Sequence, residues 1–166
     1  MEQKDLVRIR DLAKEQMEIA QSEQMKQLKK DWTALNNCQD SRPMIVVETA
    51  TFAQEIIPPL MQCQTEEGRA LEYTLLSNIV NHKLFGDDSF VNDFFPVSYD
   101  YTMIPFQLEV KKEYSEGVGH HFIPQIFDLE EDSDKIQPSS ILLTDKQITH
   151  KKIDDINALI GDILPA

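Results

Sequence analysis

The chain has 166 residues, of which 41% are hydrophobic and 8% aromatic, a composition typical of one globular domain with a real core. It carries 29 Asp and Glu residues against 16 Lys and Arg residues, for a formal net charge of −13. This imbalance argues against nucleic acid as a partner, because phosphate binding needs a concentrated positive face, and against adsorption to anionic membranes.

The cysteines and the first residues bear on the compartment. Cys38 and Cys63 match no metal-binding spacing, so we expect free, buried thiols. Met1 is followed at once by charged residues, without the pattern of a secretory signal, and the apolar runs are too short to cross a bilayer. The sequence predicts a cytoplasmic protein without a bound metal or cofactor.

The first predicted elements are two helices within residues 3–36. Apolar residues recur there at steps of three and four, as on the buried side of a helix. Ser22 belongs to the residue types that cap helix N-termini. We therefore expect a break near Gln21 and a second helix after it.

A short strand and two more helices are predicted next. Residues 44–47 are rich in β-branched side chains and are typical of a buried strand. Residues 50–57 are expected to form a short helix, which two prolines end. Thr65 is expected to cap a long helix over residues 66–84, which Gly86 closes.

The middle of the chain predicts β-structure. Residues 90–97, 103–114 and 119–126 are rich in Phe, Val, Ile and Tyr and are punctuated by Pro and Gly. Residues 107–111 alternate between polar and apolar types, as a half-exposed strand does. We expect two or three antiparallel strands here, with prolines at edges or bends.

The last part is predicted to return to helix. Residues 129–136 favour a short helix, and Thr144 or Asp145 is expected to cap a final helix that ends at Ile160. The order of N-terminal helices, central helix, small antiparallel sheet and C-terminal helix predicts an α+β fold. Without repeats or a long linker, we expect a single domain over residues 1–166.

The C-terminal residues suggest a further element. Gly161 is a good helix stop, and residues 163–165, with the sequence Ile-Leu-Pro, resemble the opening of a buried strand. A finished domain rarely exposes the first residues of a strand. We therefore expect the chain to be the front portion of a larger protein.

His120 and His121 form the most conspicuous pair of candidate functional residues. Neutral imidazole binds metals and carries protons near neutral pH. Adjacent residues on a strand point to opposite faces, so the two rings cannot easily share one metal, and we expect one ring in the core and one in water. Asp87 and Asp88 could hold a hard cation or could form a turn that satisfies its own backbone.

Arg42 directly precedes Pro43 and the predicted strand. A guanidinium at the mouth of a strand suits a carboxylate or phosphate of a ligand, and the alternative is an ion pair with one of the many acids. Arg69 and Glu72 are expected to pair with each other on the central helix. The sequence contains no glycine-rich phosphate loop and no Gly-x-Ser-x-Gly motif, so nucleotide and serine-hydrolase chemistry are unsupported.

Several short strings together resemble the N-terminal region of the uroporphyrinogen decarboxylase-like superfamily, in the branch that includes corrinoid-dependent methyltransferases. Each string is short, and the resemblance rests on their joint order and spacing from about Leu6 onward. In chain order they are Asp31-Trp32-Thr33-Ala34-Leu35-Asn36, Arg42-Pro43-Met44-Ile45-Val46, Cys63 with Arg69-Ala70-Leu71-Glu72, Phe85-Gly86-Asp87-Asp88-Ser89-Phe90-Val91, His120-His121, Ile136-Gln137-Pro138 and Gly161-Asp162-Ile163-Leu164-Pro165.

This resemblance implies a (β/α)₈-barrel enzyme preceded by helices and a small β excursion. Such a barrel needs at least about 200 residues, so this chain is too short to close one. The family's methyltransferases bind zinc through a His and two Cys near the end of the barrel, whereas Cys38 and Cys63 lie in the front section. Arg42 lies near the first strand, but the arginine cluster of the decarboxylases is missing. The resemblance therefore transfers no catalytic residue.

Our first hypothesis is a non-catalytic N-terminal segment or split subunit of a decarboxylase-like or methyltransferase-like protein, acting in capping, assembly or dimerisation. It predicts self-association or a barrel-bearing partner chain, through the apolar stripes of residues 6–35 and 148–160. The alternative is a stand-alone module that binds a tetrapyrrole, corrinoid or methyl donor through Arg42, His120 and His121. An independent enzyme is a third interpretation.

Overall fold

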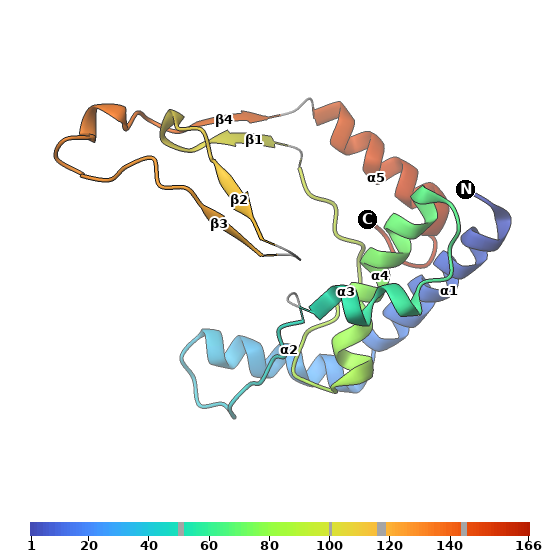
Figure 1. Cartoon of the computed structure of the whole chain (residues 1–166). Coiled ribbons are helices and arrows are strands. Elements are labelled where there is room, and N and C mark those ends of the chain that lie inside the picture. Colours follow the sequence, from blue (N-terminus) through green and yellow to red (C-terminus); the bar gives the residue numbers. More distant parts are fainter. Residues whose placement is uncertain (50–51, 100, 116–118, 144–145) are drawn as a thin grey trace. The chain divides into compact units, whose positions relative to one another are not determined.

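In the computed structural model, the chain forms two compact units with an α+β architecture (Figure 1). The first unit comprises residues 1–97 and 153–166, and the second comprises residues 98–152. No closed barrel occurs among the described residues, in agreement with the expected fold class. The single domain expected over residues 1–166 stays a prediction. The structure describes residues 1–49, 52–99, 101–115, 119–143 and 146–166.

The N-terminal region folds as the two predicted helices. Helix α1 spans Gln3–Ala20, and helix α2 spans Glu23–Asn36. The Oγ atom of Ser22 accepts a hydrogen bond from the backbone N–H of Met25 at 3.2 Å, which satisfies one of the free donors at the start of α2. The cap therefore fixes the break where the sequence predicted it.

The central helix α4 spans Glu66–Leu84 and has the predicted boundaries. The Oγ1 atom of Thr65 accepts from the backbone N–H of Gly68 at 3.2 Å. Gly68 allows close approach at this point, because an added Cβ would lie 2.7 Å from a carboxylate oxygen of Asp5. Beyond the C-terminal end, Gly86 takes a left-handed backbone conformation with φ of 58°, which favours glycine.

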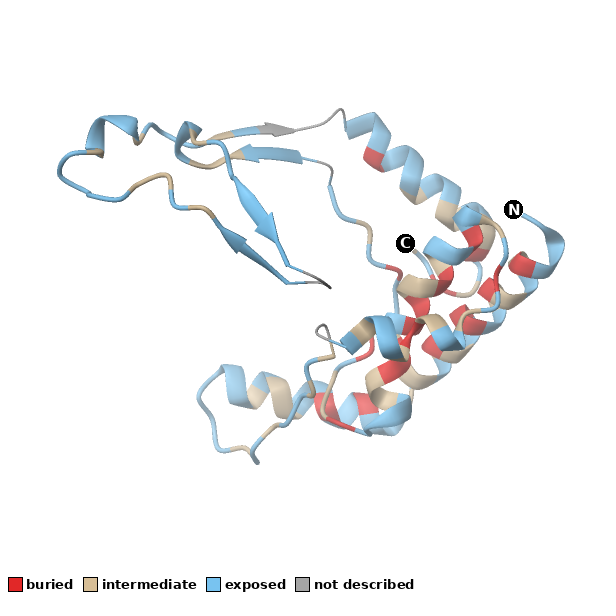
Figure 2. Cartoon of the chain, viewed as in Figure 1, coloured by how far each residue is buried: buried red, intermediate tan, exposed pale blue. Residues whose placement is uncertain are grey.

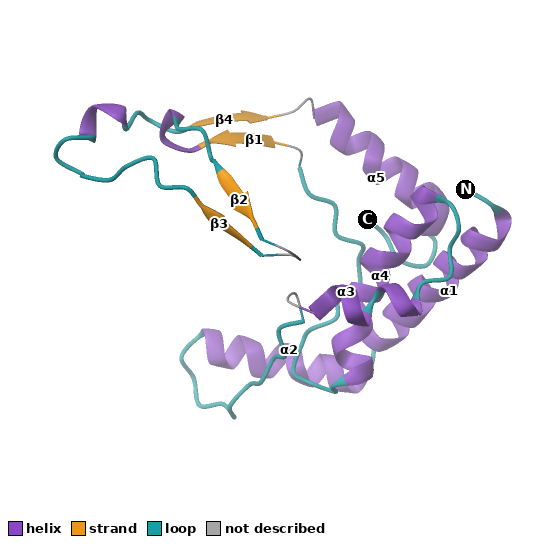
Figure 3. Ribbon diagram, viewed as in Figure 1, coloured by secondary structure: helices purple, strands orange, loops and turns teal. Residues whose placement is uncertain are grey.

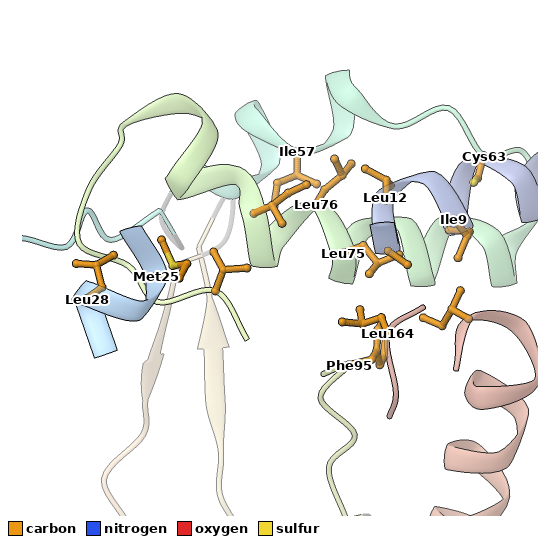
Figure 4. Packing of buried hydrophobic residues seen from close by; sticks show 14 residues of the cluster. Ile9, Leu12, Met25, Leu28, Ile57, Cys63, Leu75, Leu76, Phe95 and Leu164 are labelled. Carbon is orange, nitrogen blue, oxygen red and sulfur yellow. The ribbon is translucent and has the colours of Figure 1, made fainter. Parts of the chain in front are cut away.

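Helices α1 and α4 pack against each other and form the centre of the core of the first unit (Figure 4). Ile9 and Leu12 of α1 meet Leu75 and Ile79 of α4, and all four are buried because apolar residues at three- and four-residue spacing share one helix face. The stripe of residues 6–35 is thus used largely within the chain itself. The remaining buried apolar members are Ala13, Met25, Leu28, Ile57, Cys63, Leu76, Val91, Phe95, Ile160 and Leu164.

The C-terminal residues complete this core. Residues 163–165 form turns and not the strand opening that the sequence suggested. Leu164 has no exposed surface, and the backbone N–H of Phe95 donates to the carbonyl of Pro165 at 2.7 Å. The apolar character that suggested a strand is explained by Leu164, which packs into the core.

Two segments predicted as strands have no regular secondary structure. Residues 44–47 and 90–97 form no ladder with another strand, and all strands among the described residues lie in the second unit (Figure 3). The sequence prediction was wrong here because β-branched and aromatic composition gives no information about a partner strand. Side chains bind much of this backbone instead.

The second unit contains two small antiparallel sheets. Strand β1, Tyr101–Ile104, pairs with strand β4, Ser140–Leu143, and Thr102 lies opposite Leu142. Strand β2, Lys112–Tyr114, pairs with strand β3, His120–Phe122. The expected antiparallel pairing is confirmed, but the strands are shorter than predicted, and β4 was not predicted at all.

Three further elements test predictions from local patterns. Helix α3, Ala53–Ile56, is shorter than expected, and residues 50–51 lie outside the described residues. The helix expected at 129–136 is only a 3₁₀ turn at Ser133–Lys135. Helix α5, Lys146–Ile160, ends as predicted, and its expected cap residues 144–145 lie outside the described residues.

Burial differs sharply between the two units (Figure 2). No residue described between positions 98 and 141 is buried. Within the described ranges, no helix is long and apolar enough to cross a membrane. The first unit therefore has a core of its own, whereas the sheets of the second unit have none.

We expect Leu164→Ala to lower the free energy of unfolding of the first unit by about 2–5 kcal/mol, because it removes buried methyl groups and leaves a cavity. Urea titration followed by the fluorescence of Trp32, in the same unit, measures this change. Leu129→Ala is the matched control, since Leu129 is 70% exposed and should shift stability by less than about 0.5 kcal/mol. Equal effects of the two substitutions would contradict the assignment of Leu164 to the core.

Candidate functional site

Arg42 lies in an ion-pair cluster. Its Nη1 and Nη2 atoms donate to the two carboxylate oxygens of Asp88 at 3.0 and 2.6 Å, and its Nε atom lies 3.4 Å from a carboxylate oxygen of Asp31. The hydrogen bonds from Arg42 and from the backbone of Ile45 lower the pKa of Asp88 to about 2. Of the two roles left open for Arg42, the geometry matches the ion pair with acids of the chain.

The same cluster fixes the extended segment after Arg42. The carboxylate of Asp88 accepts from the backbone N–H of Ile45 at 2.8 Å, and the backbone N–H of Asp88 donates to the carbonyl of Ile45 at 2.8 Å. Trp32 of α2 donates from Nε1 to the carbonyl of Asp88, also at 2.8 Å. Three separate parts of the chain therefore meet at one aspartate.

Asp87 extends this arrangement into the interior. Its carboxylate accepts from the backbone N–H of Val47 at 2.8 Å and from the Nδ2 atom of Asn81 at 3.0 Å. Burial alone would raise the pKa of Asp87, but hydrogen bonds from Val47, Ser89 and Asn81 outweigh it and lower the pKa. Asp87 also accepts from the backbone N–H of Ser89 at 3.1 Å, in agreement with the expected turn, whereas the carboxylate of Asp88 accepts from the distant residues Arg42 and Ile45.

A second cluster surrounds the carboxylate of Glu72, which is fully buried on α4. Its Oε1 atom accepts from Nε of Arg8 at 2.8 Å, and its Oε2 atom accepts from the backbone N–H groups of Gln62 and Cys63, each at 2.8 Å. Burial acts to raise the pKa of Glu72, but these bonds lower it overall. The predicted pair of Glu72 with Arg69 is wrong, because Arg8 of α1 takes this position.

Asp5 of α1 binds the same loop, residues 62–65, at its second half. Its carboxylate accepts from the backbone N–H groups of Gln64 and Thr65, at 3.1 and 2.9 Å, and from the hydroxyl of Thr65 at 2.6 Å. The bonds from Thr65 lower the pKa of Asp5. Asp5 and Glu72 together hold four consecutive backbone N–H groups, those of residues 62–65.

Cys63 lies inside this cluster as a protonated thiol. Burial, and secondarily the negative charge of Glu72, raise its pKa to about 12. A thiol of this kind is a poor nucleophile, because the thiolate is the reactive form. Both cysteines are free, as predicted, but Cys38 is exposed and not buried.

Gln16 provides a third anchor. Its Nε2 atom donates to the carbonyls of Asn92 and Phe94 at 2.8 and 3.2 Å, and its Oε1 atom accepts from Nδ2 of Asn78 at 3.1 Å. The fully buried amide is thereby satisfied on both sides. This contact binds backbone carbonyls of the segment 90–97, which no partner strand pairs.

His120 and His121 both lie on the surface of β3. His121 faces Glu113 across the ladder, with 3.4 Å between Nε2 and Oε2, and the His120 ring lies 5.7 Å from that of Tyr114 and 5.2 Å from that of Phe122. The expectation of one buried ring is wrong, because the β2–β3 ribbon has no core behind it. Among the described residues, no group of His, Cys, Asp and Glu could hold a metal ion.

The structure does not define a single site that contains all three predicted ligand-binding residues. Arg42 belongs to the first unit and the two histidines belong to the second. Sequence reasoning missed the anchors Asp5 and Gln16. The signal for them was present, because both occupy positions of the α1 stripe that carries the buried Ile9 and Leu12.

No protein-family model, curated protein or solved structure matches this chain. The resemblance to the uroporphyrinogen decarboxylase-like superfamily therefore rests on the short strings alone. Three of these strings, which contribute Trp32, Arg42 and Asp88, meet in the ion-pair cluster.

Glu72→Gln should lower the free energy of unfolding by about 3 kcal/mol or more, because it breaks a buried ion pair. A glutamine has a single acceptor oxygen, so its N–H₂ group must face either Arg8 or the two backbone N–H donors, which then lose their acceptor. Urea titration at neutral pH measures the change. Glu18→Gln, at an exposed position of α1, is the control and should stay within about 0.5 kcal/mol. A Glu72→Gln variant as stable as this control would show that the cluster adds nothing to stability.

The lowered pKa values of the carboxylates in both clusters also predict how stability depends on pH. The folded-state pKa values of Asp88, Asp87 and Glu72 are lowered, so these carboxylates stabilise the fold above their ordinary pKa of about 4 and lose that effect as the pH falls through the lowered values. We expect the urea midpoint to fall between about pH 4 and pH 2. In Asp88→Asn the fall should be shallower, and identical slopes in the two proteins would contradict the prediction.

Proposed function

We propose that this chain is a non-catalytic assembly segment, the front section or a split subunit of a uroporphyrinogen decarboxylase-like protein of decarboxylase or methyltransferase type. It acts in capping, assembly or dimerisation, in the cytoplasm. The observation that carries the proposal is the second unit, in which large apolar side chains are exposed and none described between positions 98 and 141 is buried.

These side chains need a cover. A two-stranded ribbon is at best marginally stable in water, and each sheet of this unit has only two strands. Burial of apolar area on a partner would supply the missing stabilisation, and the free edges of the strands offer backbone groups for further pairing. The exposed large apolar residues of this unit are Tyr99, Tyr101, Met103, Phe106, Val110, Tyr114, Phe122, Phe127, Leu129, Ile141 and Ile148.

The polar groups of the first unit support a structural role. Arg42 is bound by two carboxylates, Glu72 by Arg8 and two backbone donors, and Cys63 has a pKa of about 12. Groups used in catalysis are instead held near the pKa that their task needs and face a substrate. The strings that suggest the family would then serve as a scaffold for the segment after Arg42.

The alternative is the stand-alone module that binds a small molecule through Arg42, His120 and His121. It has less support, because the guanidinium is already engaged by Asp88 and Asp31. Both histidines are exposed, and pockets for small ligands are concave and largely enclosed. The assembly role accounts for the exposed ribbons, which the binding module leaves unexplained.

Self-association of the full chain tests the proposal. Sedimentation velocity over a range of concentrations should reveal a dimer, and Phe122→Ser combined with Phe127→Ser should weaken it at least about tenfold, as expected for apolar anchors at an interface. Val7→Ser is the control, an exposed apolar residue of α1 in the first unit. A strict monomer whose apolar side chains are inaccessible to the neutral dye Nile red would overturn the proposal.

A further inference from the structure

We propose that a groove beside α2 in the first unit binds a small apolar anion, of the class of an aromatic carboxylate. The groove has a volume of about 560 Å³ and lies between the start of α2 and residues 90–94. Its lining residues belong to the first unit and the exposed ribbons belong to the second, so the inference does not depend on the proposed function.

The groove has an apolar floor and walls of mixed character, in which Gln21 and Asn92 accompany aromatic side chains. Met25 and Val91 form part of the lining and are themselves almost completely buried, so they provide a fixed apolar floor. Phe90 and Phe94 also line it, and both remain more than 40% exposed. Two open aromatic side chains beside an apolar floor suit a flat apolar ligand, which can stack or pack edge-on.

The positive charge on the rim of the groove favours an anionic ligand. Lys26 and Lys29 line the groove and lie one turn apart on α2, against a single acid, Asp93. Lys26 is paired with Glu23 at 2.6 Å, whereas no acid in the described part of the chain forms an ion pair with Lys29. Lys29, which is exposed, therefore offers an ammonium group to an anionic head group in a groove that apolar side chains also line.

The groove is held open by contacts outside it. Gln16 binds the carbonyls of Asn92 and Phe94, which fixes the backbone between the two exposed phenylalanines. Ser22 caps α2 and fixes the start of the helix that carries the lysines. A site whose walls are held before binding loses less entropy when the ligand arrives.

The volume and charge decide between ligand classes. A volume of about 560 Å³ lies within the range of roughly 300–1,000 Å³ typical of small-molecule sites. A phosphate or nucleic acid would need several cations or a nest of backbone N–H groups, whereas the lining offers two lysines and one aspartate. One anionic group on an apolar ring system fits best.

Two fluorescent probes with the same ring system test this inference on the full chain. Anilinonaphthalene sulfonate carries the anionic group, and phenylnaphthylamine lacks it. Lys29→Gln should weaken binding of the sulfonate about tenfold, the loss expected for one charge-assisted hydrogen bond, and should leave the neutral probe unchanged. Lys30→Gln, the neighbouring lysine of α2 that does not line the groove, is the matched control, and Lys29→Arg should restore binding.

Naphthoate should displace the sulfonate from the wild-type chain, which assigns the site to aromatic carboxylates. The dye can also bind the ribbons of the second unit, so titrations are repeated in the Phe122→Ser, Phe127→Ser variant. Loss of the sulfonate signal in that variant, equal effects of the Lys29 and Lys30 substitutions, or failure of naphthoate to compete would each overturn the inference. None of these outcomes bears on dimer formation, which sedimentation measures separately.

Discussion

The first unit depends on one kind of interaction, in which a polar side chain binds the backbone of an extended segment. Carboxylates of α1 and α4 accept the N–H groups of residues 62–65, an amide of α1 donates to two carbonyls within residues 92–94, and two adjacent aspartates accept N–H groups within residues 45–47. In a sheet, a neighbouring strand would pair these groups. No strand is described in this unit, so side chains bind these groups instead, and the segments have no regular secondary structure.

This solution has a cost that the sequence offsets locally. A buried carboxylate loses its hydration, which is unfavourable unless charge and hydrogen bonds replace it. Glu72 receives both, from the guanidinium of Arg8 and from two backbone donors. In return, the contact favours one path of the chain, because the buried carboxylate is stable only when a loop places its N–H donors beside it. The segments that line the apolar groove and follow Arg42 are therefore set by polar contacts as much as by hydrophobic packing.

Local signals predicted the long helices α1, α2 and α4 well, because the decisive contacts lie within a few residues, whereas they overpredicted the helix at 129–136. Ser22 and Thr65 bind backbone groups three residues ahead, and both helix starts were found from the sequence. The strands were predicted poorly, since a strand exists only with its partner, and β4 pairs with a segment far away in the chain. The site shows the same limit. An ion pair for Arg42 was predicted as an alternative. Which of the 29 acids is its partner depends on the tertiary structure and could not be predicted from local sequence.

The contrast between the two units bears on function. The first unit fills its core with its own residues, Leu164 included, and its buried Asp5, Gln16 and Glu72 side chains have hydrogen-bond partners, whereas the buried Nδ1 atom of His82 has none among the described residues. The second unit exposes aromatic side chains on ribbons too small to cover them, and the cation of Lys112 over the ring of Phe122 is a modest contact. Large apolar side chains are exposed in both units, among them Ile45, Phe85 and Phe94 in the first, but the first unit also has a buried core and the sheets of the second unit have none. The proposed assembly role rests on this difference, because apolar side chains on ribbons without a core gain stability when another protein surface buries them.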